Sequence, residues 1–396
     1  MGQNIVLGLG NNTDYEIVWD SSVLESLIIE YGISSSELSN INVISSIRDL
    51  VVSILDFINK GSGGERFVAS PYIIEKFSDL FKKKITLGGT SIRAAIAMDR
   101  MGYSSALHMV TNNEHVQRLT PKGCDWICSN EGESSYPHLI IQFSKGIRIQ
   151  AEDLDIVSEN SNRIIYVNDL DNTFMNLSPE LPALVSDARV FLISGFNAMR
   201  SSTLLAERLS DLKRTISALP DDSIVFYEDA YFHEPELIQL VHEELLDSIN
   251  IYSMNEEELQ AYLGRDISLI EPLDIYNALE ELYIKISVPL LVIHTQCWAL
   301  AYGTNAKEYK DALKGGITMA TTRYRCGDDF TPEDYRDTEL IPGNEKGTIF
   351  SLEIIRMASG KICCLPVPLI SKKTVTTIGL GDAFVGGFLP ALVKNK

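Results

Sequence analysis

Short apolar runs alternate with segments of helical spacing throughout the second half of the chain. Four runs of four or five mostly apolar residues predict strands at 190–194, 224–227, 249–253 and 290–294. Apolar residues that recur three or four positions apart predict helices at 203–219, 235–246, 256–263 and 273–286. Further helices are expected at 315–324 and 348–358, and a strand at 362–365. Strands alternating with helices predict βαβ units and a parallel sheet.

The first half of the chain has a less regular pattern. It predicts strands at 5–9 and 106–110, a helix at 44–58, and a helix at 91–101 that follows Gly88-Gly89 and ends at Gly102. Residues 138–143, 147–151 and 164–167 alternate apolar and polar side chains, and no helical segment separates them. We therefore expect a small antiparallel sheet that differs from the rest of the fold.

Composition narrows the class of protein. A chain of 396 residues can form one large α/β domain with a smaller appendage, and its formal net charge of -20 disfavours nucleic acid and anionic membranes as partners. The six cysteines match no zinc spacing. The N-terminal residues lead directly into a strand pattern, and no stretch approaches the ~20 apolar residues of a membrane span. We expect a cytosolic protein; its oligomeric state is not predicted.

A glycine-rich turn near the C-terminus carries the most specific chemical signal. Gly379 and Gly381 flank Leu380, Asp382 follows, and the apolar run 383–393 predicts a helix. Free N–H groups in the first turn of a helix favour an anion. An acid beside bound phosphate can take the proton of an attacking hydroxyl, as a small-molecule kinase requires. The alternative is that Asp382 only caps the helix after a glycine turn.

Other polar residues follow predicted strands, where ligands of parallel sheets bind. Asp14 follows the first strand and suits a polyol, or forms an Asx turn. Glu228 and Glu258 can hold Mg²⁺ near phosphates, although Asn255 and Glu258 also have capping-box spacing. His294 ends a strand and can equally be structural. The chain contains no Walker-type phosphate-binding loop. It also lacks the third glycine of the Gly-x-Gly-x-x-Gly fingerprint that binds dinucleotides.

Together these residues resemble the ribokinase superfamily of sugar and nucleoside kinases. Gly379-Leu380-Gly381-Asp382 resembles its anion-hole and base motif, and Gly88-Gly89 its sugar-site segment. Within the superfamily, the chain is similar to the ADP-dependent glucokinase and phosphofructokinase family. The segments that carry this closer similarity are Asn12-Thr13-Asp14, Gly63-Gly64-Glu65, Asn255 to Glu258, and the leucine between the two glycines.

The chain also departs from that family. The family often has His-x-Glu where this chain reads Phe226-Tyr227-Glu228, and Asn or Gln with Ala where it reads Thr90-Ser91. The segment 383–388 is closer to ATP-dependent relatives. An ATP-dependent carbohydrate or nucleoside kinase and a non-catalytic nucleotide or sugar sensor are therefore alternatives. A dinucleotide-dependent enzyme ranks last.

The resemblance implies a doubly wound, mostly parallel sheet with helices on both faces and a small β-rich lid. The whole chain, 1–396, would form this α/β domain, with lid insertions near 15–20, 61–85 and 126–169. Asn12, Asp14, Glu65, Gly88 and Gly89 would hold the sugar.

The resemblance also implies the roles of the remaining site residues. Asp382 would be the general base, with Gly379 and Gly381 forming the anion hole. The nucleotide would contact Ile378, Leu380, His294 and Asn255, and Mg²⁺ would lie near Glu228 and Glu258. The partners would be ADP or ATP and a small sugar. A phosphorylated sugar needs a basic clamp, for which the candidates are Arg93, Arg163, Arg200 and Arg323.

Overall fold

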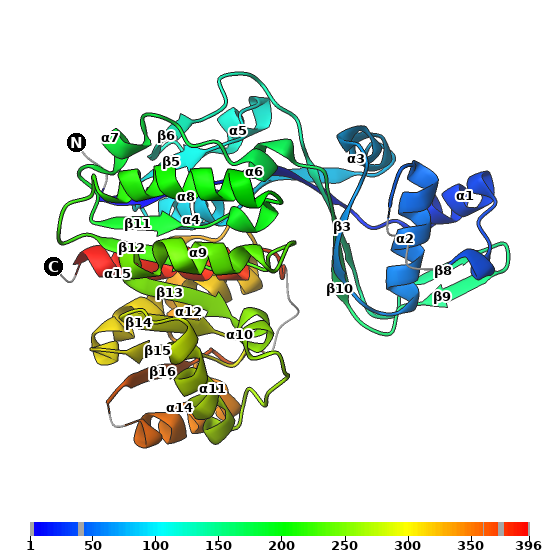
Figure 1. Ribbon diagram of the computed structural model, residues 1–396. Coiled ribbons are helices and arrows are strands. Elements are labelled where there is room, and N and C mark those ends of the chain that lie inside the picture. Colours follow the sequence, from blue (N-terminus) through cyan, green and yellow to red (C-terminus); the bar gives the residue numbers. More distant parts are fainter. Residues whose placement is uncertain (1–3, 39–42, 359, 371–375, 395–396) are drawn as a thin grey trace.

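The computed structural model describes residues 4–38, 43–358, 360–370 and 376–394, which form two units (Figure 1). The larger unit is built on a nine-stranded sheet. Its strands in spatial order are β16 (Ile362–Pro366), β15 (Trp298–Gly303), β14 (Leu290–His294), β13 (Ile251–Asn255), β12 (Ile224–Glu228), β11 (Val190–Ile193), β1 (Ile5–Leu7), β5 (Ser105–Met109) and β6 (Cys124–Cys128). Neighbouring strands are parallel except where β15 pairs with β14 and β16. This confirms the mostly parallel α/β fold.

Helices cover both faces of this sheet because successive strand residues point to opposite sides. Tyr227 and Tyr252 face one core and Phe226 and Ile251 face the other. The helices of the first face are α7 (Leu181–Val185), α8 (Ser202–Ile216), α9 (Leu237–Leu245), α10 (Glu256–Leu263), α11 (Pro272–Lys285) and α14 (Glu345–Met357). The second face is covered by α4 (Thr90–Arg100), α5 (Glu114–Leu119), α12 (Lys310–Cys326) and α15 (Leu380–Lys394). Two further helices, α6 (Leu170–Phe174) and α13 (Pro332–Glu339), are peripheral.

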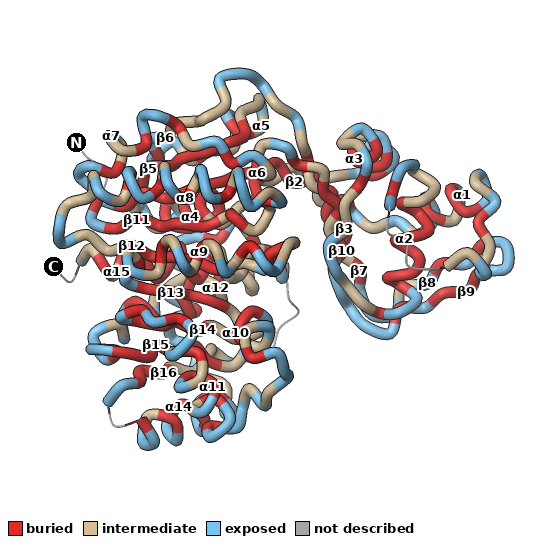
Figure 2. The backbone as a smooth tube through the Cα atoms, viewed as in Figure 1, coloured by how far each residue is buried: buried red, intermediate tan, exposed pale blue. Residues whose placement is uncertain are grey.

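The smaller unit has its own five-stranded sheet and its own core (Figures 1 and 2). Its strand order is β3 (Gly64–Phe67), β10 (Asn162–Val167), β7 (His138–Phe143), β2 (Asn12–Ile17) and β4 (Lys83–Gly88). The helices α1 (Ser21–Tyr31), α2 (Ile47–Asn59) and α3 (Pro71–Ser78) belong to it, as does the hairpin of β8 (Arg148–Ala151) and β9 (Leu154–Val157).

Three expectations about this region need correction. The small sheet is mixed, because β2 pairs with β7, and β3 with β10, in parallel. The unit is not simply β-rich, since α1 and α2 contribute much of its core. The expected lid segment 126–169 begins too early, because residues 126–128 lie in β6, which pairs with β5 in the large sheet. A lid role for this unit stays a prediction.

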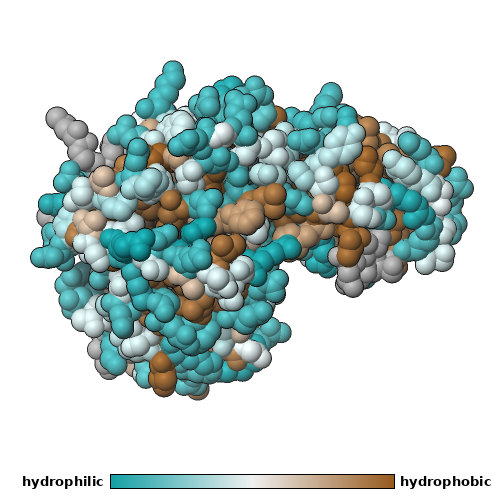
Figure 3. Space-filling view, turned by 45° about the horizontal axis from the view of Figure 1, so that its top comes forward, coloured by the Kyte–Doolittle hydropathy of each residue, from teal (hydrophilic) through white to brown (hydrophobic). Residues whose placement is uncertain are grey.

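The surface agrees with the acidic composition. The face shown in Figure 3 is mostly hydrophilic, with small hydrophobic patches, one of them near the junction of the two units. No helix in the described part of the chain is long and apolar enough to cross a membrane. All six cysteines are free thiols.

Candidate active site

The glycine-rich turn opens α15 at its end nearest the smaller unit (Figure 1). Gly379 has φ +61°, a conformation that favours glycine, and its carbonyl accepts the N–H of Ala383 at 3.0 Å. The N–H groups of Leu380, Gly381 and Asp382 precede this first helical bond and therefore lack intrahelical acceptors. The N–H of Ile378 donates to Thr376 Oγ1 at 3.1 Å, and the expected contact of Ile378 with the nucleotide stays a prediction.

Two buried arginines surround this turn. Arg323 on α12 donates through Nη1 to the Gly379 carbonyl at 2.6 Å, while its Nε and Nη2 both donate to Asp328. Arg93 on α4 also lies beside the turn, with Nε 3.8 Å from Asp382 Oδ2. A β-carbon at Gly379 would lie 2.6 Å from Arg93 Nη1 and 2.8 Å from Asp382 Oδ2. The Asp382 carboxylate, the turn and the guanidinium groups are therefore close together.

The charges of the two arginines act on each other. Burial lowers the pKa of Arg323, and the nearby charge of Arg93 lowers it further. Burial acts in the same direction on Arg93, but the carboxylates of Asp14 and Asp382 outweigh it and raise the pKa of Arg93. Both groups remain cations, since a guanidinium does not lose its proton in proteins.

Arg93 connects Asp382 to the expected sugar site. Its Nη2 donates at 2.6 Å to Asp14 Oδ2, and Asn12 Nδ2 donates at 2.6 Å to Asp14 Oδ1. Asp14 is only 2% exposed and lies inside β2, so the Asx-turn alternative is wrong. A β-carbon at Gly88 would lie 2.5 Å from Asn12 Nδ2 and 2.6 Å from Asp14 Oδ2. Asn12, Asp14 and Gly88 therefore meet at one place, as expected.

Glu65 on β3 faces the larger unit. Its Oε1 lies 3.2 Å from Nε2 of His233, a residue of the segment between β12 and α9. Burial favours a higher pKa for Glu65, but the hydrogen bond and charge of His233 outweigh it and lower this pKa. The His233 ring also packs edge-on against Phe67, 4.7 Å between centroids. On β7, His138 Nε2 lies 3.0 Å from Asp169 Oδ2.

The acids expected near the metal lie at the ends of β12 and β13. His294 Nε2 and Glu228 Oε1 are 3.0 Å apart, and the His294 ring stacks on Phe384 of α15, 4.7 Å between centroids. Asn255 and Glu258 form a complete capping box, in which Glu258 Oε2 accepts the Asn255 N–H at 2.7 Å. Asn255 and Glu258 therefore cap the helix, as the alternative interpretation predicted. This capping role does not exclude the expected role of Glu258 beside a metal.

Two observations bear on whether a divalent cation fits beside these acids. Glu228 Oε2 and Ser253 Oγ are buried without a hydrogen-bond partner in the described structure. Burial raises the pKa of Glu258 well above its usual range, and the charge of Asp229 adds to the effect. A cation near Glu228 and Glu258 would relieve both features. No cluster of three or more His, Cys, Asp or Glu side chains suited to a metal exists among the described residues, so phosphate and water would supply the other ligands.

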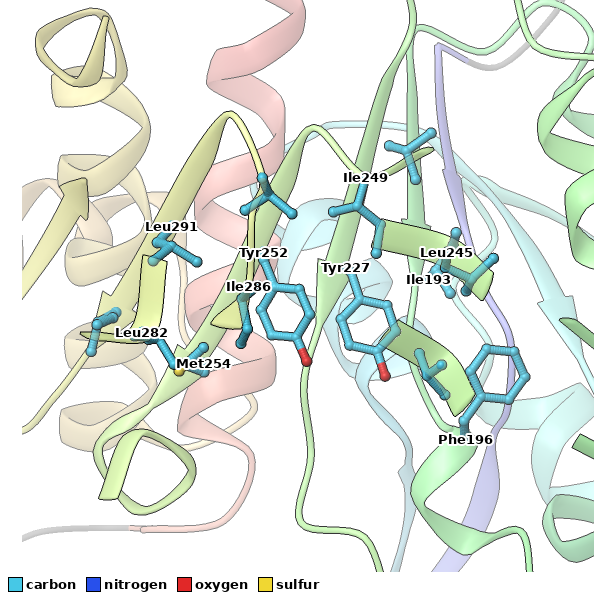
Figure 4. Packing of buried hydrophobic residues seen from close by; sticks show 14 of the residues in the cluster. Ile193, Phe196, Tyr227, Leu245, Ile249, Tyr252, Met254, Leu282, Ile286 and Leu291 are labelled. Atoms are coloured by element: carbon cyan, nitrogen blue, oxygen red, sulfur yellow. The ribbon is translucent and has the colours of Figure 1, made fainter. Parts of the chain in front are cut away.

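Beneath these acids lies a buried polar network that the sequence did not reveal. Tyr252 and Tyr262 both donate to Asp229 Oδ2, at 3.0 and 2.5 Å, and His242 Nε2 lies 3.0 Å from the Tyr252 hydroxyl. Tyr227 and Tyr252 lie side by side with their hydroxyls pointing the same way (Figure 4), and their centroids are 4.9 Å apart. Burial raises the pKa of Asp229 to about 6.

Comparison with known proteins shows which family the chain belongs to. Residues 3–389 match the family described as the ADP-specific phosphofructokinase/glucokinase conserved region. The chain belongs to this family. An ADP-specific phosphofructokinase of Pyrococcus horikoshii is 24% identical over 385 residues, covering 82% of this chain and 83% of that protein. A homologue of the same name from Thermococcus litoralis is 25% identical over 296 residues, covering 65% of this chain and 63% of that one.

Solved structures agree on the fold. A phosphofructokinase from Pyrococcus horikoshii OT3 with AMP superposes with a TM-score of 0.81 at 18% identity, covering 100% of this chain and 99% of that one. An ADP-dependent kinase in complex with fructose 6-phosphate and ADPβS gives 0.72 at 13% identity, covering 99% and 94%. The ADP-specific phosphofructokinase/glucokinase family comprises sugar kinases that take the phosphoryl group from ADP and normally use a divalent metal. The resemblance, the fold class and the kinase class read from the sequence are thereby confirmed.

The structure also places the four candidate arginines. Arg93 and Arg323 flank the turn. Arg163 on β10 donates through Nη1 to the Thr377 carbonyl at 3.0 Å, which links the smaller unit to the segment before α15. The Arg200 guanidinium lies over the Phe67 ring, 3.4 Å from its centroid. Sequence spacing could not place them, because each depends on contacts between segments far apart in the chain.

Proposed function

We propose that this chain transfers the terminal phosphoryl group of ADP to a hydroxyl of a sugar or sugar phosphate, with Asp382 as general base. One observation carries the proposal: the Asp382 carboxylate lies at the first turn of α15, and Arg93 connects it to buried Asp14. The attacking hydroxyl would sit between these two carboxylates. The phosphoryl group would sit against the unpaired N–H groups of residues 380–382.

Each of these groups would have a separate task. Asn12, Asp14 and the Gly88-Gly89 backbone would orient the acceptor, with Glu65 contributing from β3. Asp382 would accept the hydroxyl proton as the oxygen attacks, which is worth about 10²–10⁴-fold. The first turn of α15 would stabilise the charge on the phosphoryl oxygens. Approach of the smaller unit would exclude water, so that the phosphoryl group goes to the sugar.

We propose Mg²⁺ as the metal, held near Glu228 and Glu258 through water, with Glu228 Oε2 available as a ligand. When bound, it would neutralise charge on the nucleotide phosphates. His294 would hold Glu228 in place and, through its contact with Phe384, would align it with α15. Phe226 replaces the histidine often found two residues before this glutamate, and it packs against Phe388, 5.5 Å between centroids. The metal would therefore have one candidate ligand fewer.

The acceptor we favour is fructose 6-phosphate, because the similar proteins bear the name phosphofructokinase. Arg163 and Arg200 both lie near the junction of the two units and are candidates for its phosphate. Glucose is the second candidate, because Glu65 matches the family glutamate that touches the sugar. Cytosolic location fits the six free thiols.

The test is a coupled assay of ADP and ATP against fructose 6-phosphate, glucose, ribose and nucleosides in the presence of Mg²⁺. We expect turnover with ADP and formation of AMP. Asp382→Asn should fold normally, with an unchanged Tm, and lose about 10²–10⁴-fold in kcat. A preference for ATP would refute the donor, and an unchanged rate in Asp382→Asn would refute the base. Binding of nucleotide and sugar with no turnover would instead indicate a sensor.

A further inference from the structure

The two arginines at the α15 turn are not equivalent in their hydrogen bonding. Arg323 uses Nη1 for the Gly379 carbonyl and both Nε and Nη2 for Asp328, so every nitrogen of its guanidinium has an acceptor. Among the described residues, Arg93 donates a hydrogen bond from Nη2 alone, to Asp14, and its Nε has a longer contact with Asp382. No acceptor for Arg93 Nη1 is present among the described residues, although the side chain is only 6% exposed.

The Nη1 atom of Arg93 lies beside the glycine-rich turn before α15. A β-carbon on Gly379 would lie 2.6 Å from Nη1, so this nitrogen lies directly beside the turn whose N–H groups face the phosphoryl position. Asp382 likewise has no hydrogen bond within the described structure. Arg93 Nη1 is therefore a donor, and Asp382 an acceptor, without a hydrogen bond at the same helix N-terminus. A ligand bound there could accept a hydrogen bond from Arg93 and donate one to Asp382.

We propose that Arg93 is a catalytic residue that donates from Nη1 to the phosphoryl group in transit while Nη2 holds Asp14. This inference rests on the proposed function. In the transfer, the acceptor oxygen forms a bond to the β-phosphorus and the bond from that phosphorus to the bridging oxygen of ADP breaks. AMP leaves, and the hydroxyl proton goes to Asp382. The guanidinium bridges the group that orients the acceptor and the group being transferred.

Arginine suits this position better than lysine. Its planar fork presents separate nitrogens to Asp14 and to the phosphoryl oxygen at the same time, whereas an ammonium group is a point charge on one atom. Arg323 has the different task of a positioning residue, because its bond to the Gly379 carbonyl fixes the turn. The other charged groups that face Arg93 are Glu16 on β2 and Arg323 on α12.

Steady-state kinetics of Arg93→Gln and Arg93→Lys test the assignment. Loss of an electrostatic donor to the transferring group costs about 10²–10³-fold in kcat, so we expect this loss in Arg93→Gln, with a smaller rise in the acceptor KM. Arg93→Lys should restore the Tm that Arg93→Gln loses, because lysine keeps the positive charge beside Asp14, but it should not restore kcat. Arg100→Gln is the matched control, because Arg100 lies on the same helix, pairs with Asp329 on the surface, and should leave both constants unchanged. A kcat within threefold of wild type in Arg93→Gln overturns the assignment.

A binding experiment separates this inference from the proposed function. Calorimetric titration of orthovanadate in the presence of AMP probes the phosphoryl position without turnover. Arg93→Gln should weaken vanadate binding at least tenfold, and equal affinity would overturn the role of Arg93 even if no acceptor were turned over. Because Arg93→Gln leaves the buried Asp14 carboxylate without its cation, the double variant Asp14→Asn/Arg93→Gln provides a folded comparison, in which binding should stay equally weak. Failure of the whole donor and acceptor panel in wild type, with normal vanadate binding, overturns the proposed function alone.

Discussion

Gly88 and Gly89 are adjacent, yet the structure predicts that alanine has opposite consequences at the two positions. At Gly88 a β-carbon would meet the side chains of Asn12 and Asp14 at 2.5 to 2.7 Å, and backbone conformation is no obstacle. Both side chains must move away, which weakens the 2.6 Å bond between Arg93 and Asp14. A hydrogen bond to a charged group contributes about 1.5–3 kcal/mol, which corresponds to about 10- to 150-fold in kcat/KM for the acceptor.

At Gly89 the obstacle is the backbone itself. Its φ of +99° and ψ of 140° lie in a region that only glycine adopts readily, at a cost of about 1–3 kcal/mol for alanine. Its β-carbon would also lie 2.9 Å from the Gly10 carbonyl oxygen, which cannot rotate away. Gly89→Ala should therefore lower the free energy of unfolding by at least about 1–3 kcal/mol.

The two effects are measured separately. Urea denaturation gives the stability of both variants, and steady-state kinetics at saturating ADP gives kcat/KM for the acceptor. Gly88→Ala should lose activity and less stability than Gly89→Ala, because the atoms that it displaces are the ends of side chains and not backbone. If Gly88→Ala retained full kcat/KM, Asp14 and Asn12 would not hold the acceptor. Equal destabilisation of both variants would show that the Gly88 contacts are purely structural.

Two further predictions concern Glu228 and Asp229, the acids at the end of β12. Glu228→Gln removes a carboxylate beside the proposed metal. It should raise the Mg²⁺ concentration for half-maximal kcat at least about tenfold, with little change in the acceptor KM. An unchanged Mg²⁺ dependence would exclude Glu228 as a residue that holds the metal. The pKa of Asp229 is raised to about 6, so the native state keeps a proton that the unfolded chain loses near pH 4. This group therefore contributes stability that falls, by up to about 3 kcal/mol, as pH rises from about 4 to 6. Asp229→Asn should flatten that slope in urea titrations, and an identical slope would contradict the assignment.

The sequence was most informative where one segment fixes its own structure. The helix 256–263 and the strands 138–143 and 290–294 have the predicted bounds, because each combines clear periodicity with local end signals such as the Asn255 cap. The turn before α15 is equally local, since Gly379 adopts a positive φ and the helix follows at once.

The features that the sequence did not predict depend on contacts between residues that are distant in the chain. The β2 strand reads as a turn in sequence, because Asn12 to Asp14 are polar; it is a strand because it pairs with β4 and β7. The antiparallel strand β15 follows β14 after a short turn. Because no helix separates the two strands, the alternation of strands and helices did not predict β15. Arg93 lies in a helix whose periodicity explains its apolar neighbours, and its partner Asp14 is 79 residues earlier. No spacing rule joins such residues.

The arrangement of charge explains how so acidic a protein can hold a nucleotide. With a net charge of -20, the field of the whole molecule opposes the approach of ADP, so positive potential must be local. In the proposed site, the turn of α15 supplies it mainly from the helix terminus and Arg93. Arg323 is neutralised by Asp328, which Lys84 of β4 also contacts at 2.9 Å. Arg93 is shared by two carboxylates, and in the proposed mechanism one of them, Asp382, would become neutral as it takes the acceptor proton. The charge of Arg93 would then be least compensated at the moment when charge moves between ADP and acceptor, which is when its stabilisation would lower the barrier.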